Sequence, residues 1–336
     1  MADAWSAGAL ICPARSCHAP AAPTLPVALD RYWASSDPAR APCGCDRAAN
    51  MDLALRVRQN MCGRSDHNQE IDIADLAAAL GVTRGVFLEM GGHDGLANTN
   101  TRYLESCLRW RGALIEADDR AFAALRRNRP TTLAVRVAAC RTHGKLEMLR
   151  RNSLKANEVD ATTAFTDRPG TSSDRAHSWM KNQSSNVERT HVPCGPLTSY
   201  LRLLRTQRVD AFFLDIEGAE LLTLQTVDWC SIDIGLLIVE FSAEAKQNNK
   251  RIHELLTNQG FELVSCVTIW RNHIYNLVYL RAAHFGFGPP HELPPAALEW
   301  IGERRHGAPA STFDRCPRIN GSAFARAPPA VVVARS

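Results

Sequence analysis

The chain has 336 residues, of which 45% are hydrophobic and 22% are charged, and its formal net charge is +4. This composition predicts a globular protein and excludes a highly charged unfolded chain. No apolar stretch approaches the roughly 20 residues of a membrane-spanning helix, and residues 1–34 contain no signal-peptide core. We therefore expect a cytoplasmic protein without a membrane span. The arginines are spread along the chain, which argues against a nucleic-acid surface.

The two ends of the chain differ in composition from its middle. Residues 1–65 and 286–336 are rich in Ala and Pro, and closely spaced prolines interrupt helices and strands. We therefore predict a poorly ordered N-terminal segment (1–65), one domain (66–285) and a C-terminal tail (286–336). Residues 151–190 are rich in Ser, Asn and Thr, and a connection of this kind within a domain predicts a lid or an insert.

The sequence contains 11 cysteines. Those in the middle of the chain lie singly within helix and strand patterns, which predicts small buried hydrophobic side chains. Cys43 and Cys45 form a close pair, but no second pair follows at zinc spacing. We therefore predict no metal site.

Helix and strand patterns alternate along the domain, as in a doubly wound α/β sheet. The final two strands are separated by three residues, which predicts an antiparallel hairpin. The expected elements, in chain order, are a helix at 73–80, a strand at 86–88, a helix at 100–109, a strand at 113–116, a helix at 120–128, a strand at 133–138, a helix at 197–205, a strand at 211–216, a helix at 221–226, a strand at 236–241, a helix at 250–258, and strands at 262–270 and 274–280.

The segment VFLEMGGHDG at residues 86–95 is the most informative one. An apolar run without polar alternation is typical of a strand covered on both faces, and it meets an acid, Glu89, just before a glycine-rich turn. Gly91, Gly92 and Gly95 allow positive φ and a close approach of a ligand to the backbone. The pattern indicates a nucleotide-like cofactor, although glycine turns also follow strands where nothing binds.

The next strand ends in a second acid, Glu116, at the place where doubly wound folds bind the ribose hydroxyls of adenosine. The dinucleotide fingerprint GxGxxG is absent, because Gly91 is followed by Gly92, His93 and Asp94. A carboxylate in this turn repels a pyrophosphate and suits a cationic adenosine cofactor such as S-adenosylmethionine. Alternatively, Asp94 is the N-cap of the following helix.

Six motifs together resemble the FkbM-type S-adenosylmethionine-dependent methyltransferases, in particular their eukaryotic-style branch. They are FLEMGGHDG (87–95), NTNTRYLE (98–105), WRGALIE (110–116), VPCGPL (192–197), FFLDIEGAE (212–220) and LIVE (237–240). A series of motifs in order is more specific than any one of them. The resemblance implies a class I methyltransferase (Rossmann-like) doubly wound sheet, mostly parallel with an antiparallel C-terminal edge hairpin. It also implies S-adenosylmethionine as cofactor and O-methylation of a hydroxyl or carboxyl acceptor.

One position departs from the family, which usually carries Ala-Asn where this chain has Gly92 and His93. Imidazole can still donate and accept hydrogen bonds, so His93 is either a cofactor contact or an exposed loop residue. The cofactor contacts that these motifs imply are Glu89, Gly91, Gly92, His93, Asp94, Gly95, Asn100 and Glu116.

The catalytic hypothesis concerns DIEGAE (215–220), which ends the fourth strand next to the expected crevice. Methyl transfer requires an aligned acceptor oxygen that loses a proton. Asp215 is the first choice for orienting the acceptor or removing the proton, and Glu217 is the second. Alternatively, Glu217 and Glu220 are simply the acidic first turn of a helix. Glu240 is a weaker candidate for lining the same cavity.

The sequence thus predicts an S-adenosylmethionine-dependent methyltransferase whose acceptor is a small molecule, a glycan or a lipid. Two alternatives stay open at this stage. One is a non-catalytic interaction protein that keeps the sheet, and the other is a nicotinamide-dependent oxidoreductase, which the missing fingerprint disfavours. The oligomeric state does not follow from the sequence.

Overall fold

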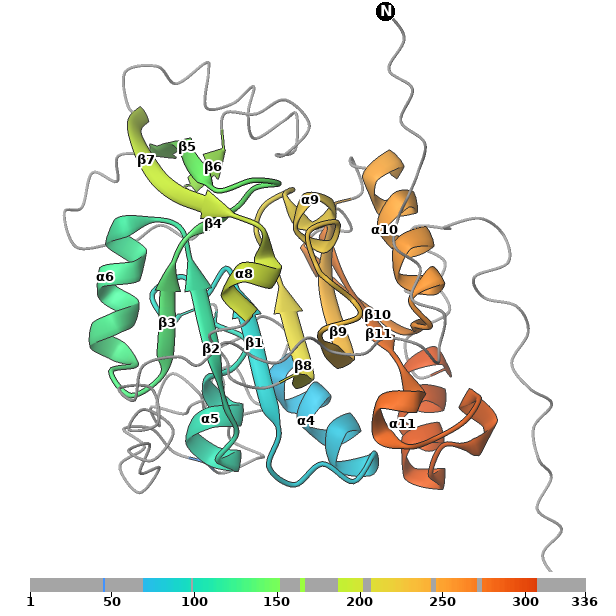
Figure 1. Ribbon diagram of the computed structural model, residues 1–336. Coiled ribbons are helices and arrows are strands. Elements are labelled where there is room, and N and C mark those ends of the chain that lie inside the picture. The colour runs from blue at the N-terminus through green and yellow to red at the C-terminus, as the bar shows by residue number, and fades with distance from the viewer. Residues whose placement is uncertain are drawn as a thin grey trace, which may run out of the picture.

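Two β-sheets organise the computed structural model, which describes Cys45 and residues 69–97, 99–151, 164–166, 187–201, 207–242, 246–270 and 274–306. The main sheet has seven strands in the order β10-β11-β9-β8-β1-β2-β3. A second sheet has four strands in the order β4-β7-β5-β6. Figure 1 shows helices on both faces of the main sheet and the second sheet beyond the end toward which β2 and β3 run.

The main sheet is parallel except at β11. β1, β2, β3, β8 and β9 pair in parallel, whereas β11 pairs antiparallel with both β9 and β10. The predicted class I methyltransferase fold is therefore confirmed, with the detail that β11 lies between β9 and β10. The expected hairpin turn, 271–273, lies outside the described residues. The strands are β1 (Val86–Met90), β2 (Arg111–Glu116), β3 (Leu133–Arg136), β8 (Arg208–Leu214), β9 (Asp233–Ser242), β10 (Glu262–Trp270) and β11 (Ile274–Leu280).

Two clusters of buried side chains cover the two faces of this sheet. Residues of α4, α5, α6 and α11 pack on one face, and residues of α8, α9 and α10 pack on the other. Because both faces are covered, the central strands are apolar along their length. The helices are α4 (Gln69–Ala79), α5 (Arg102–Leu108), α6 (Asp119–Asn128), α8 (Leu197–Leu201), α9 (Glu220–Leu224), α10 (Lys246–Asn258) and α11 (Pro295–His306), with short 3-10 helices η5 (Ala282–Phe285) and η6 (Pro290–Glu292).

The C-terminal part of the core differs from the predicted tail at 286–336. Helix α11 begins at Pro295, a residue that suits the first position of a helix. Ala297, Trp300 and Ile301 are at most 7% exposed and pack in the same cluster as α4. Their i, i+3, i+4 spacing is the signal that the proline-rich composition concealed. Residues 307–336 lie outside the described part of the chain.

The second sheet was not expected from the sequence, which predicted a lid or insert at 151–190. It consists of β4 (Ala138–Ala139), β5 (Gly144–Arg151), β6 (Ala164–Thr166) and β7 (Val187–Gly195). Charged residues interrupt β5 and β7, so neither strand shows a clear apolar alternation. Because β4 follows β3 directly, this sheet starts at the carboxyl end of the main sheet (Figure 1). Residues 152–163 and 167–186 lie outside the described residues.

Cysteines cross-link the structure. Cys140 and Cys194 are buried in the core of the second sheet, as expected of small hydrophobic side chains, but they form a disulfide with each other. A second disulfide joins Cys45 to Cys107 in α5. The sequence pattern missed these pairs because their partners lie far apart in the chain. Among the residues described, no helix combines the length and apolar character needed to cross a membrane.

Candidate active site

The turn after β1 is fixed by backbone contacts with both neighbouring strands. The N–H groups of Gly91 and Gly92 donate to the carbonyl of Ile115 at 2.9 and 3.1 Å, and Asp215 N–H donates to the carbonyl of Met90 at 3.1 Å. Gly91 has a φ of 94°, and a Cβ atom at this position would collide with the carbonyl oxygen of Asp215. Only glycine satisfies both constraints.

The positive φ angles of this turn are not all where the sequence predicted them. They occur at Gly91, His93 (47°) and Gly95 (70°), but not at Gly92. Gly92 is instead a packing position, because an added Cβ would lie 3.1 Å from the Leu125 side chain. Histidine is one of the residues that enter the left-handed region more readily than most, which accommodates His93.

Glu116 at the end of β2 binds the same turn. Its Oε2 accepts the N–H of His93 at 2.8 Å, and its Oε1 accepts the N–H of Asp118 at 2.8 Å. Burial raises the pKa of Glu116 to about 7 despite these two hydrogen bonds. Each carboxylate oxygen has a second lone pair, so Glu116 retains capacity for ribose hydroxyls.

Asp94 stabilises the turn itself rather than capping α5. Its Oδ1 accepts the N–H groups of Leu96 and Ala97 at 2.8 and 2.7 Å, which is an Asx turn. Helix α5 begins later, with Thr101 at its N-cap, so the N-cap alternative for Asp94 is wrong. Burial acts to raise the pKa of Asp94, but His93 and these two amides outweigh it and the pKa is lowered.

The His93 imidazole lies in this turn beside the Asp94 carboxylate. Neither ring nitrogen has a hydrogen-bond partner within the described chain, and Nδ1 lies 3.6 Å from Asp94 Oδ1. Burial lowers its pKa, but the carboxylates of Asp94 and Glu116 raise it more, so the net shift is upward. His93 can therefore offer hydrogen bonds to a bound ligand.

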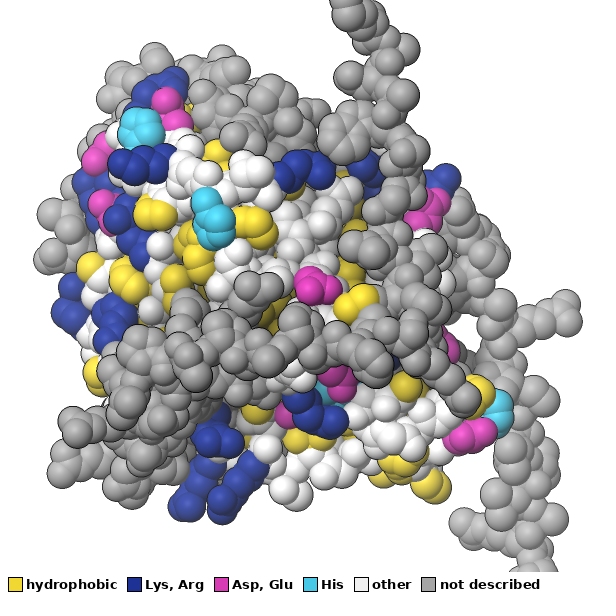
Figure 2. Space-filling model, viewed as in Figure 1, with side chains coloured by type: hydrophobic (Ala, Val, Ile, Leu, Met, Phe, Trp, Pro, Cys, Tyr) yellow, Lys and Arg dark blue, Asp and Glu magenta, His cyan; other side chains and the backbone are white. Residues whose placement is uncertain are grey.

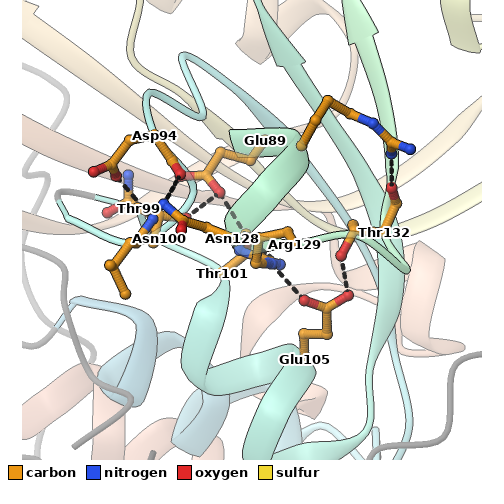
Figure 3. A network of polar contacts seen from close by, with 11 residues as sticks. Glu89, Asp94, Thr99, Asn100, Thr101, Glu105, Asn128, Arg129 and Thr132 are labelled. Carbon is orange, nitrogen blue, oxygen red and sulfur yellow. Dashed lines mark hydrogen bonds and ion pairs between the residues drawn. The ribbon is translucent and has the colours of Figure 1, made fainter. Parts of the chain in front are cut away.

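Glu89 holds a neighbouring loop (Figure 3). Its side chain is buried and accepts hydrogen bonds from Thr99 Oγ1 (2.8 Å), Asn100 N (2.6 Å) and Thr101 Oγ1 (2.6 Å). Burial raises the pKa of Glu89, while these donors and Arg129 act in the opposite direction. Glu89 and Asn100 are thus brought together, although the contact uses the backbone of Asn100.

Arg129 extends this network to α5 and α6, and the sequence analysis did not single it out. Its Nε lies 2.5 Å from Glu105 Oε2, and its NH1 lies 3.4 Å from the hydroxyls of both Thr99 and Thr101. Glu105 also accepts a hydrogen bond from Thr132 (Figure 3). The buried guanidinium therefore joins the Glu89 loop to both helices beside the glycine turn.

A second turn follows β8 and carries the predicted catalytic residues. Glu217 and Gly218 both have positive φ angles, 58° and 104°. Glu220 begins α9 and reaches back to accept the N–H groups of Ile216 (3.1 Å) and Gly218 (3.0 Å). Glu220 is thus an acid of the first turn of α9, as the alternative hypothesis predicted. Asp215 and Glu217 lie before this helix, in the turn that follows β8.

Four carboxyl groups interact at this end of the sheet: Asp215, Glu217, Glu220 and Glu240. Burial, with Asp215 and Glu220 next in size, raises the pKa of Glu217 to about 8. Burial likewise raises the pKa of Glu220 to about 7. The pKa of Glu240 lies well above its usual value because of burial and the other acids, and Glu240 hydrogen bonds to Asp215. Such a cluster retains protons at neutral pH or attracts a cation.

No metal site emerges from these acids. Within the part of the chain that the structure describes, no group of three or more His, Cys, Asp or Glu side chains has a geometry that could hold a metal ion.

The sheet is that of a class I methyltransferase, with a glycine turn after β1, Glu116 at the end of β2 and an acidic turn after β8. Residues 89–263 match the family described as the Methyltransferase FkbM domain, which is just over half of the chain. The chain therefore belongs to the FkbM methyltransferase family. It is an S-adenosylmethionine-dependent methyltransferase by family, which confirms the predicted cofactor.

Solved structures show weaker similarity. A fibrillarin pre-rRNA processing protein of Methanococcus jannaschii is 12% identical, covering 60% of this chain and 67% of its own, with a TM-score of 0.33. A TehB-like SAM-dependent methyltransferase of Corynebacterium glutamicum is 10% identical, covering 70% and 100%, with a TM-score of 0.32. Fibrillarin of Aeropyrum pernix with S-adenosyl-L-methionine bound is 12% identical, covering 62% and 73%, with a TM-score of 0.34. Comparison with curated proteins gives no match.

Replacing Gly91 is expected to destroy the cofactor turn. Gly91→Ala should abolish S-adenosylmethionine binding and lower stability, since the left-handed φ alone costs about 1–2 kcal/mol and the Asp215 carbonyl blocks the new methyl group. Gly92→Ala is the matched control, because its φ is not positive and the Leu125 side chain can shift. Calorimetric titration and thermal denaturation of both variants test this. Equal affinity in the two variants would contradict it.

The acidic cluster is expected to make stability fall as the pH rises. Glu217 has a folded pKa of about 8, above its unfolded value of 4.5, so the folded state binds the proton more tightly between these pH values. Its stabilising contribution is complete below about pH 4.5 and is lost as the pH rises through about 8. Glu217→Gln should therefore gain stability relative to the parent protein from pH 5 to pH 8, as measured by urea denaturation.

A control on α10 separates this effect from general surface charge. Glu254 is half exposed and pairs with Lys250, so Glu254→Gln should leave the pH dependence of stability unchanged. If the pH dependence were the same in Glu217→Gln and the parent protein, the raised pKa of this carboxyl would be refuted.

Proposed function

We propose that this protein is an O-methyltransferase that acts on a hydroxyl group held at the turn after β8. The supporting observation is that Asp215 and Glu217 share a partly buried acidic cluster whose first residue lies against the Gly91 backbone. When bound, S-adenosylmethionine supplies an electrophilic methyl group on a positively charged sulfur. The residues of the two turns must then bind this cofactor, orient the acceptor oxygen and remove its proton.

The residues of the first turn fit this cofactor. Glu116 has lone pairs left for ribose hydroxyls, and within the described chain neither ring nitrogen of His93 makes a hydrogen bond, although Nδ1 lies 3.6 Å from Asp94 Oδ1. Asp94 adds negative charge, which suits a cationic ligand. Glu89 acts through the loop that contains Asn100 rather than by exposing its own carboxylate. We propose that Glu116 and His93 make the direct contacts.

The second turn supplies the base in this proposal. Glu217, with its pKa raised to about 8, is more basic when ionised than an ordinary carboxylate. Asp215 is anchored through its N–H to Met90 and hydrogen bonds to Glu240. We therefore assign orientation of the acceptor hydroxyl to Asp215 and proton removal to Glu217, with the proton shared among the neighbouring acids.

The same charges discriminate between the two acceptor classes that the family resemblance implies. An ionised carboxyl acceptor would add a further negative charge to a cluster in which repulsion among the acids already raises the pKa of Glu217 and of Glu240. A hydroxyl acceptor is neutral and gains a hydrogen-bond acceptor in the cluster. Alcohol groups of small molecules, glycans or lipids are therefore the proposed substrates.

The basic surface gives no reason to choose a nucleic-acid acceptor instead. Lys and Arg side chains gather over α6 and the second sheet, but Asp and Glu side chains lie among them (Figure 2). Two ion pairs neutralise part of this charge, Arg120 with Glu188 and Arg189 with Glu147. None of these four residues belongs to the turn after β1 or to the turn after β8.

The catalytic residues can be tested separately from cofactor binding. Asp215→Asn and Glu217→Gln should each lower kcat by about 100-fold or more, the usual contribution of a positioned base, with affinity for S-adenosylmethionine nearly unchanged. In the parent protein the rate should rise with pH up to about 8. The measurements are transfer of labelled methyl groups to neutral alcohols, carboxylates and amines, and calorimetric titration of the cofactor. Glu254→Gln is again the control.

Each contrary result has a distinct meaning. Preferential methylation of carboxylates would contradict the electrostatic argument. Cofactor binding without transfer to any component of a source-cell extract would favour the non-catalytic interaction protein. The nicotinamide alternative has lost its support, because the family is a methyltransferase family.

A further inference from the structure

We propose that Arg150, in the second sheet, is a positioning residue for the cofactor site. It fixes the turn that follows Glu116, so that this carboxylate faces the ribose. The inference rests on the proposed function in one respect, namely that Glu116 binds the ribose hydroxyls of the cofactor.

Arg150 is buried and binds three carboxylates at once. Its NH1 donates to Asp118 Oδ2 at 2.7 Å and also contacts Asp119 Oδ1, while its NH2 lies 2.9 Å from Glu188 Oε1. Asp118 and Asp119 lie at the start of α6, whereas Glu188 belongs to β7. The side chain of Arg150 is only 5% exposed, so water screens these contacts weakly.

Asp118 relays this contact to Glu116. Its Oδ1 caps α6 by accepting the N–H groups of Arg120 and Ala121, both at 2.9 Å. Its own N–H donates to Glu116 Oε1 at 2.8 Å. A continuous series of hydrogen bonds therefore runs from Arg150 through Asp118 to the carboxylate that also holds the His93 amide.

The second sheet is a firm support for this series. Ala117, directly after Glu116, packs against the small core of that sheet, which contains Ala138, Cys140, Leu146, Met148, Val192 and Cys194. A buried ion pair is weak as a source of stability, because desolvation offsets its attraction. Because the same guanidinium also holds Asp119 and Glu188, its hydrogen bond to Asp118 Oδ2 does, however, restrict where Asp118 can lie. We infer that Arg150 contributes to function by orienting the Glu116 carboxylate through Asp118.

Arg150→Lys tests the geometry while keeping the charge, since an ammonium group cannot reproduce the guanidinium fork. We expect the Kd and KM for S-adenosylmethionine to rise about 10- to 100-fold, with kcat at saturating cofactor little changed. Arg189→Lys is the matched control, because Arg189 lies in the same sheet but is exposed and pairs with Glu147 of β5. Its cofactor affinity should equal that of the parent protein.

Two further measurements separate this role from folding and from the proposed function. The double variant R150M/D118N removes both charges of the buried Arg150–Asp118 pair. This variant should remain folded but bind the cofactor weakly. Amide hydrogen exchange at residues 116–121 should be faster in Arg150→Lys even without cofactor. Parental affinity and parental exchange in both folded variants would overturn the proposal. If the parent protein bound no cofactor while exchange still increased in Arg150→Lys, the proposed function would fail and the positioning role would stand.

A separate observation concerns the compartment in which this protein folds. Every cysteine whose side chain the structure describes is in a disulfide, namely Cys45, Cys107, Cys140, Cys194 and Cys230. Cytosolic reductants keep thiols reduced, so disulfides of this number are typical of proteins in oxidising compartments. We infer that this methyltransferase folds in an oxidising compartment, which replaces the cytoplasmic location expected from the sequence.

Peptide mapping without reduction tests this inference on protein taken from its own cells after rapid alkylation. We expect Cys140 and Cys194 to be recovered as one linked peptide, and reduction to lower the Tm by about 10 °C. Without reductant, the Cys140→Ser/Cys194→Ser variant should have a lower Tm than the parent protein. Alkylation of both cysteines in the untreated protein, together with a Tm insensitive to reductant, would overturn the inference.

Discussion

The site depends on how closely the ends of β1 and β8 approach each other. Met90 and Leu214 pair in register, and the next residues, Gly91 and Asp215, meet with no room for a side chain between them. The turn proposed to bind the cofactor and the turn proposed to bind the acceptor are therefore joined by backbone contact. A shift in one must move the other, so the sheet fixes the separation of the two proposed binding turns.

This geometry concentrates acids, and the acids oppose folding at neutral pH. Glu217, Glu220 and Glu240 all have raised pKa values, because each is buried near the others. Such an arrangement is expected where function, rather than stability, selects the residues. A cationic cofactor would relieve part of this repulsion when it binds, and a base of raised pKa is useful only with an acceptor that must lose a proton.

The sequence predicts the strands that build this site because both faces of the central sheet are buried and their apolar runs are long. It also locates Glu116 and Asp215, since acids at strand ends converge at one edge of a parallel sheet. It does not reveal that Glu89 serves the loop at 99–101, because that requires knowing how the chain returns over β1. The second sheet was missed because its strands carry many charges, and Arg150 was missed with it.

The second sheet makes charged and covalent contacts that it would not need if it only shielded the end of the main sheet from water. A cap that only excluded water could attach through apolar contacts, which cost no desolvation of charge. This sheet instead places a buried guanidinium on the N-cap of α6, and the same N-cap residue donates to Glu116. The Cys140–Cys194 disulfide lies in the core against which Ala117 packs. Electrostatic and covalent constraints thus act on the residues just after Glu116, where a small displacement would move a proposed cofactor contact.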